Sequence, residues 1–362
     1  MRVFNLSSMK TRRLLFGLGL VALAVIAELT QVSLPMVDAL DRFFYDSRMR
    51  LQPPKPSSRI IIVDIDEKSL AAQGRWPWSR EQVARLTQIL AKEGGARAIG
   101  FDLVFAEPQP QSDSVLAKAF ANAPVALGYY FSSEVGAFSS GQLPQPVWPA
   151  ATLREQGFSI TSWAGYGANV APLARAARAA GFFNPMVDRD GVVRSLPLLA
   201  EHHDQLYESL AVSVLRLYFG NAPLSLHGAG DQADSLGFGA SGAQARIPIS
   251  VGTTALVPFQ GRGGAASSRF RYISATDVLE GRVEPRLFQD RIVLVGTSAP
   301  GLTDLRATPV SEVYPGVEVH ASLIAGALEG TIHRRPPEAP LVSALLIAVV
   351  VGGAALAMTG AG

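Results

Sequence analysis

The stretch from Ile60 to Arg80 reads IIIVDIDEKSLAAQGRWPWSR, and its first half indicates the fold of the chain. It begins with a short, continuous run of β-branched apolar residues, which is typical of a strand buried on both faces of a parallel sheet. Two aspartates, Asp64 and Asp66, end this run, and a loop that carries Arg75 and two tryptophans follows. Acids at a strand end beside such a loop indicate a catalytic centre, a binding rim or ordinary packing.

The segments around this strand predict a β-α-β unit. Ser79 is expected to cap a helix that ends at Gly94, and ARAIGFDLVFAE (96–107) is expected to form the next strand. Two strands joined through one helix over this length are expected to be parallel. RIVLVG (291–296) predicts another buried strand, and PGVEVHASLIAGALEG (315–330) predicts a helix. We therefore expect an α/β fold with a mostly parallel central sheet, flanking helices and β-rich insertions.

The composition predicts membrane segments that bracket this domain. Hydrophobic residues make up 48% of the 362 residues and charged residues only 17%, below the roughly 25% of soluble domains. Residues 14–36 and 341–360 are the predicted transmembrane helices, although a cleaved signal peptide is an alternative for the first. The basic residues within 1–13 place that segment in the cytoplasm and the domain at 38–335 outside. We expect the natural chain to continue past residue 362 into a cytoplasmic output domain.

Charge and cysteine content exclude several classes of function. The net charge is only +2 and no basic stripe is present, so we expect no nucleic acid as a partner. The chain has no cysteine, which excludes structural disulfides, thiolate catalysis and cysteine-based zinc sites.

Acidic residues near the predicted strand ends are the main candidates for a site, because ligands of open α/β sheets bind beyond the carboxyl ends of the strands. Asp102 is expected inside its strand, where a buried carboxylate needs a partner such as Arg75 or Arg306. Converging carboxylates suit magnesium or calcium, whereas aspartates at strand ends also cap the next helix. We expect no cofactor, with a divalent cation as the lesser alternative. The candidate ligand-binding residues are Asp66, Arg75, Trp76, Asp102, Glu107, Ser298, Asp304 and Arg306.

Common catalytic loop patterns are not met. The segment GTSAPGLT (296–303) has the glycine spacing of a phosphate loop, but Leu302 stands at the position of the essential lysine. A weaker anion site made of backbone amides stays open. Ser298 is not in a nucleophile elbow, because Pro300 replaces the second glycine. We expect His320 on the inward face of its helix, as a hydrogen-bonded core residue.

Five blocks of the sequence resemble, in order, successive segments of the type-two CHASE domain, the cyclase/histidine-kinase-associated sensory extracellular domain. The blocks are VDIDEKSLAAQGRWPWSR, GARAIGFDLVFAEPQ, DRDGVVRSLPL, LVGTSAPGLTDLRATPV and PGVEVHASLIAGAL, and the resemblance extends over nearly all of 38–335. It implies a bacterial inner-membrane receptor with a periplasmic sensory domain. The cytoplasmic outputs of such receptors include adenylate or guanylate cyclases and kinases. The resemblance carries over neither a ligand nor binding residues.

The leading hypothesis is a sensory input domain that transmits a conformational change through membrane helices. Its expected partners are membrane lipid, an unknown extracytoplasmic ligand or envelope protein, and a second copy in a homodimer. We expect no catalysis by the residues present, and expect the enzymatic activity in the cytoplasmic part. The alternatives are an anchored enzyme in which Asp66, Asp102 and Asp304 converge, with or without a metal, and an envelope interaction module.

Overall fold

The structure is a computed structural model that divides into two units, residues 46–334 and a unit of the two terminal segments. It describes residues 35–134, 139–228, 233–239, 242, 244–299, 304–334, 341–346 and 348–350, together with positions 17, 19, 21, 22, 25, 26 and 353. Most of the predicted membrane segments lie outside this description, as do residues 300–303 of the predicted anion site at 296–303. In the part that is described, no helix has both the length and the apolar character required to span a bilayer. The bracketing membrane helices therefore stay predictions.

A seven-stranded sheet forms the centre of the larger unit and confirms the predicted α/β class. All its strand pairs are parallel except the pair formed by the last strand, β5, which runs antiparallel to the end of β3. Strand β16 lies between the first two strands of the chain, and its residues pair with both. The strands in spatial order are β15 (Arg271–Ser274), β1 (Ile60–Ile65), β16 (Ile292–Thr297), β2 (Ala98–Phe101), β3 (Val125–Ser132) and, both beside β3, β6 (Ala179–Phe182) and β5 (Gly165–Gly167).

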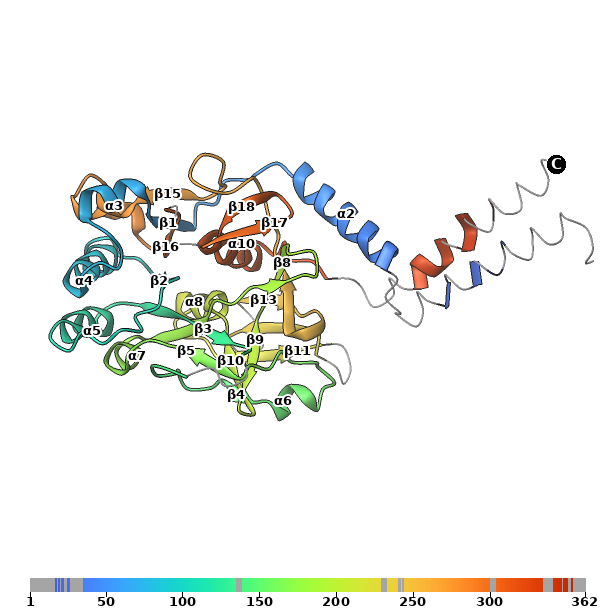
Figure 1. The fold of residues 1–362 in the computed structure, drawn as a ribbon, viewed down its shortest axis with the longest axis horizontal. Coiled ribbons are helices and arrows are strands. Elements are labelled where there is room, and N and C mark those ends of the chain that lie inside the picture. The colour runs from blue at the N-terminus through green and yellow to red at the C-terminus, as the bar shows by residue number, and fades with distance from the viewer. Residues whose placement is uncertain are drawn as a thin grey trace, which may run out of the picture. The chain divides into compact units, whose positions relative to one another are not determined.

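Helices cover both faces of this sheet (Figure 1). Successive residues of β1 alternate between the faces, so that Ile61 and Val63 pack with one set of helices and Ile60 and Ile62 with the other. The first set comprises α3 (Glu67–Gln73), α4 (Arg80–Gln88, continued by a π-helical turn at Ile89–Glu93), α5 (Asp113–Ala121), α7 (Ala171–Ala176) and α9 (Ala275–Leu279). The second comprises α8 (Leu210–Tyr218) and α10 (Gly316–Glu329).

Short antiparallel sheets make up the predicted β-rich insertions. The strands are β4 (Trp148–Pro149), β7 (Met186–Val187), β8 (Val193–Pro197), β9 (Leu199–His202), β10 (Gln205–Glu208), β11 (Leu224–His227), β12 (Ser235–Phe238), β13 (Ala245–Pro248), β14 (Thr254–Leu256), β17 (Leu305–Thr308) and β18 (Ser311–Pro315). The remaining helical elements are α2 (Pro35–Leu51), α6 (Ala151–Arg154) and the 3-10 turns Val251–Thr253 and Pro285–Phe288. The β7–β8 hairpin turns at the DRDG segment, which carries Asp188 and Gly191.

The helix α10 is buried almost throughout, from Gly316 to Ala327. A Cβ atom at Gly296 of β16 would lie 2.6 Å from the Cβ of Val317, so the glycine permits α10 to lie directly on the sheet. Glu318, with no exposed surface, fixes the helix further. Its carboxylate accepts hydrogen bonds from a group of backbone and side-chain donors, namely Gly264 N, Ser268 Oγ, Tyr272 Oη and Tyr314 Oη. The position of α10 is thus set by close packing and by a buried carboxylate whose oxygens are hydrogen-bonded.

The prediction for the second strand was partly wrong. We expected it to extend over 96–107, but β2 ends at Phe101, so Asp102 follows the strand and does not lie inside it. The backbone N–H of Asp102 still donates to Val295 O at 2.8 Å, which continues the pairing with β16 by one residue. The chain then leaves the sheet, and the Asp102 side chain comes to the edge where ligands of such folds bind.

We expect Gly296→Ala to lower the free energy of unfolding by about 1–3 kcal/mol, because the added methyl group overlaps Val317 and neither backbone can move without disturbing the sheet. Urea unfolding followed by circular dichroism measures the change. The control is Val115→Ala, at an exposed position of α5, which should shift the value by less than about 0.5 kcal/mol. Equal effects of the two changes would contradict close contact between α10 and β16.

Candidate functional site

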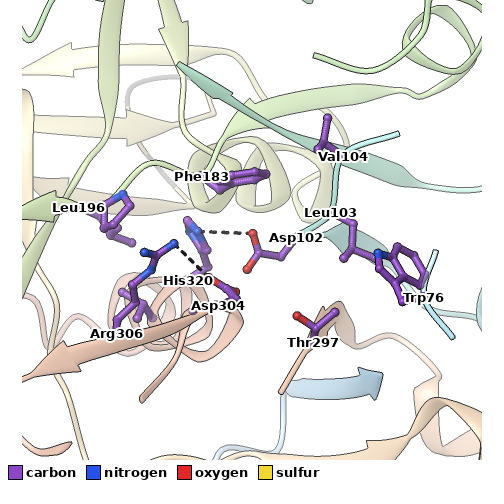
Figure 2. Close-up of a pocket in the computed structure, with 13 residues that line it drawn as sticks. Trp76, Asp102, Leu103, Val104, Phe183, Leu196, Thr297, Asp304, Arg306 and His320 are labelled. Atoms are coloured by element: carbon purple, nitrogen blue, oxygen red, sulfur yellow. Dashed lines mark hydrogen bonds and ion pairs between the residues drawn. The ribbon is translucent and has the colours of Figure 1, made fainter. Parts of the chain in front are cut away.

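A cavity of about 290 Å³ opens where β2 and β16 end and α10 begins. Its walls come from segments far apart in the sequence, which the parallel sheet brings to one edge (Figure 2). Its polar groups gather on the side next to α10 and its aromatic groups on other walls. The lining residues are Trp76, Asp102, Leu103, Val104, Phe183, Pro185, Leu196, Thr297, Asp304, Arg306, Gly316, Val319 and His320.

Two carboxyl groups in this cavity share one cation. Arg306 donates from Nη2 to Asp304 Oδ1 at 3.2 Å, and Asp304 lies next to Asp102. Burial raises the pKa of Asp102 well above its usual range, and the nearby charge of Asp304 raises it further, while Arg306 lowers it. Burial also raises the pKa of Asp304, against the lowering effect of Arg306. The pair therefore favours a state in which one proton is held between the two carboxyl groups.

The start of α10 is shaped to receive Asp304. Gly316 N donates to the backbone carbonyl of Asp304 at 2.8 Å. A Cβ atom at Gly316 would lie 2.3 Å from both carboxylate oxygens of Asp304, so only a glycine leaves room for them. A negative group at a helix N-terminus is stabilised by the helix dipole and by the free N–H groups. Asp304 thus occupies the place that an external anion would otherwise take.

His320, one turn along α10, completes the polar side of the cavity. Its Nε2 atom lies 4.0 Å from Asp102 Oδ1, and its side chain is 4% exposed. Burial lowers the pKa of His320 to about 4; an interaction with the Phe183 backbone acts in the opposite direction, and the charge of Arg306 lowers the pKa again. The imidazole is therefore neutral at physiological pH and does not neutralise Asp102.

Trp76 forms an aromatic wall of the cavity. Its ring packs edge-on against Trp78, with centroids 5.8 Å apart, and tilted against Phe105 at 6.5 Å. The arginine that is built into this region is Arg80, whose guanidinium is buried and donates to Asp113 Oδ1 at 2.8 Å. Arg75 is exposed, with no hydrogen bond or ion pair to any described residue, so it is not the partner of Asp102 that we considered.

The structure separates the eight predicted site residues into two groups. It brings Trp76, Asp102, Asp304 and Arg306 together in the cavity. The remaining four, Asp66, Arg75, Glu107 and Ser298, do not line it. Glu107 is exposed, and its backbone carbonyl accepts a hydrogen bond from Arg80.

Asp66 has a structural role, as the capping alternative anticipated. Its Oδ1 atom accepts from the Ser69 backbone N–H at 2.8 Å, which caps α3, and from Ser274 Oγ at 2.7 Å. The hydroxyl of Ser298 donates to Asp64 Oδ2 at 2.5 Å, and burial raises the pKa of Asp64 to about 6. The anchored-enzyme alternative requires Asp66 to lie with Asp102 and Asp304. The Asp66 side chain instead caps α3 and does not line the cavity.

The described acidic and histidine side chains differ in arrangement from a metal centre. Within the described residues, no group of three or more His, Asp or Glu side chains is arranged to hold a metal ion. Two carboxyl groups, a neutral imidazole and an arginine beside apolar and aromatic walls can instead bind a polar organic molecule and exchange a proton with it.

Comparison with known proteins identifies the family. The model of the CHASE2 domain matches residues 20–359, nearly the whole chain, so this chain belongs to the CHASE2 domain family. Domains of this family are extracytoplasmic sensory domains of membrane receptors. Neither a curated protein nor a solved structure matches the chain.

Three residues of the site were not expected from the sequence. His320 was interpreted as a core residue, although its position one turn after Gly316 places it beside any ligand held at the start of α10. Gly316 and Phe183 gave no signal in the sequence, since their importance depends on segments that fold against them from elsewhere.

We expect Asp102→Asn to flatten the dependence of stability on pH. The folded state holds the Asp102 proton more tightly than the unfolded chain, so the wild type loses stability as pH rises above about 4, by up to ~1.4 kcal/mol per pH unit until the folded-state pKa is passed. The variant carries no such proton. Urea unfolding at several pH values measures the difference. If the wild type instead became more stable than the variant as the pH rises, the pKa of Asp102 would not be raised in the folded state.

The opposite pH dependence is expected for His320→Gln. The pKa of His320 is lowered to about 4 in the fold, so the wild type loses stability as pH falls from about 6.5, because the unfolded histidine takes up a proton. The variant lacks this loss. The control, His333→Gln, changes an exposed histidine and should leave the pH profile unaltered. If the two variants gave the same profile, His320 would not be a buried neutral base.

Proposed function

We propose that this chain senses a small molecule outside the cytoplasm and that the ligand binds in the cavity at the start of α10. The supporting observation is the place of the cavity: its lining includes Gly316, Val319 and His320, all within the first five residues of the helix that ends the sheet domain. The chain after this helix leads into the predicted second membrane segment at 341–360. A ligand in the cavity therefore contacts the element nearest to the output.

The contacts along α10 support a role in transmission. Glu318 ties its first turn to the segment that contains Gly264 and Ser268. At the other end, Glu329 accepts from Arg269 Nη2 at 2.6 Å. The helix is thus attached at both ends to the same stretch of chain, and a shift of its start is passed to its end as one rigid piece. A ligand transmits a signal only if it binds two such arrangements with different affinity.

The remaining elements of the proposal follow from the family. We propose that the domain faces the periplasm, that residues 14–36 and 341–360 cross the inner membrane, and that two copies act as a homodimer. A cytoplasmic nucleotide cyclase or kinase is the proposed output. These proposals rest on the family's place in membrane receptors and on the apolar sequence of the two segments.

A reporter fusion tests the transmission. The chain is joined after residue 362 to a reporter cyclase, and cyclic nucleotide is measured in cells. Gly316→Ala forces Asp304 away from the start of α10 and should change the output several-fold at equal protein level. The control is Gly281→Ala, at a turn with positive φ and no atom nearby, which carries a backbone cost of about 1 kcal/mol away from the cavity.

The outcomes of this experiment are distinct. An output that changes with Gly316→Ala but not with Gly281→Ala supports the cavity as the input. Unaltered output in the Gly316 variant, with the protein folded and present in the membrane, contradicts it. Inserting residues between positions 335 and 340 should uncouple the cavity from the reporter, and unchanged coupling there would contradict transmission by α10.

A further inference from the structure

Asp102 is a buried carboxyl group that has no cation in hydrogen-bond contact among the described residues. Its side chain is 5% exposed and lines the cavity. No N–H group of the described residues donates a hydrogen bond to its carboxyl group, which is hydrogen-bonded to the carboxyl group of Asp304, and Nε2 of His320 lies 4.0 Å away. Buried carboxylates are normally paired or hydrogen-bonded, because an unpaired charge in a dry site is costly. The cavity therefore lacks one positive group beside Asp102.

The charged groups that line the cavity also indicate that one positive charge is lacking. Among the described lining residues, the titratable side chains are Asp102, Asp304, Arg306 and His320, and Arg306 is paired with Asp304. With the imidazole neutral and both carboxyl groups ionised, the site carries one uncompensated negative charge. A proton held by the pair balances it in the unliganded protein, and a ligand that carries a positive charge can take the place of that proton.

The arrangement disfavours an anion. The start of α10, where an anion would bind, already holds the carboxylate of Asp304. The other walls are apolar or aromatic, with Trp76 and Phe183 among them, and Figure 2 shows both rings at the border of the cavity that contains Asp102. Aromatic faces attract organic cations and also bury their apolar parts. The aromatic walls therefore favour a cation, which is also the charge needed to balance the carboxyl pair.

We propose that the cavity binds an organic ammonium or guanidinium ligand, whose cationic group pairs with Asp102 beside Asp304 and whose apolar part packs against Trp76 and Phe183. This inference rests on the proposed function and names the class of its ligand. Binding releases the proton shared by the two carboxyl groups to the solvent, so the charge of the site stays balanced. Arg306 keeps its contact with Asp304 and limits the site to one added cation.

Matched probes test the class of ligand. Titration calorimetry on the full chain compares benzylammonium, guanidinium and methylammonium with benzyl alcohol and benzoate. We expect the cations to bind, with benzylammonium the tightest because its ring contacts the aromatic wall, and we expect no binding of the alcohol or benzoate. Because one proton leaves, the affinity for benzylammonium should rise by about tenfold per pH unit below the pKa of the carboxyl pair. The proton release appears as a dependence of the heat on the ionisation enthalpy of the buffer.

The variants separate charge from structure. Asp102→Asn keeps the shape of the side chain and should weaken benzylammonium by about 30-fold or more. The control, Asp290→Asn, changes an exposed residue at positive φ, a conformation that asparagine adopts readily, and should leave the affinity unchanged. The buffer dependence of the wild type needs no variant, so the test stands even if Asp102→Asn unfolds.

Two results overturn the inference. One is tighter binding of benzoate than of benzylammonium, and the other is binding of none of the three cations at millimolar concentration. If either occurs while Gly316→Ala still alters the reporter output, the ligand class is wrong and the sensory role of the cavity remains. If the reporter is also insensitive, the proposed function fails as well.

Discussion

The site depends on a charge imbalance: it contains two carboxyl groups, those of Asp102 and Asp304, and a single arginine, Arg306. Asp102 follows β2, Asp304 precedes β17, and only the insertion of β16 beside β2 brings both to the same edge of the sheet. Arg306 neutralises one of the two, and the buried His320 stays neutral. The proton held between the two carboxyl groups and the proposed preference for a positive ligand both follow from that imbalance. The fold stabilises this arrangement because Gly316 and the start of α10 accommodate the Asp304 carboxylate.

Much of this arrangement could be predicted from the sequence. The apolar runs of β1 and β16 gave the parallel sheet, and the rule that ligands bind beyond the carboxyl ends of strands selected Asp102 and Asp304. Arg306 and Trp76 were also selected, from their positions in neighbouring loops. These predictions needed only local pattern and one general property of α/β sheets.

The rest depended on contacts that no local pattern encodes. Asp66 also stands at a strand end, but its side chain turns to cap α3, a choice that the sequence left open. Arg75 and Arg80 are both near the tryptophans, and only the position of Asp113 makes Arg80 the buried one. The strands β6 and β15 escaped prediction because they are short and join the sheet through partners distant in the sequence.

The burial of α10 has a consequence for how this domain evolves. A surface helix tolerates exchange on its outer side and shows a 3.6-residue rhythm of variable and invariant positions. Here the residues from Gly316 to Ala327 have no outer side, and small side chains such as Ala321 and Ala325 lie among close neighbours. The sequence of relatives should therefore vary little on every side of this helix, without a 3.6-residue period. Differences in the proposed ligand preference would then arise in the loops that face the helix.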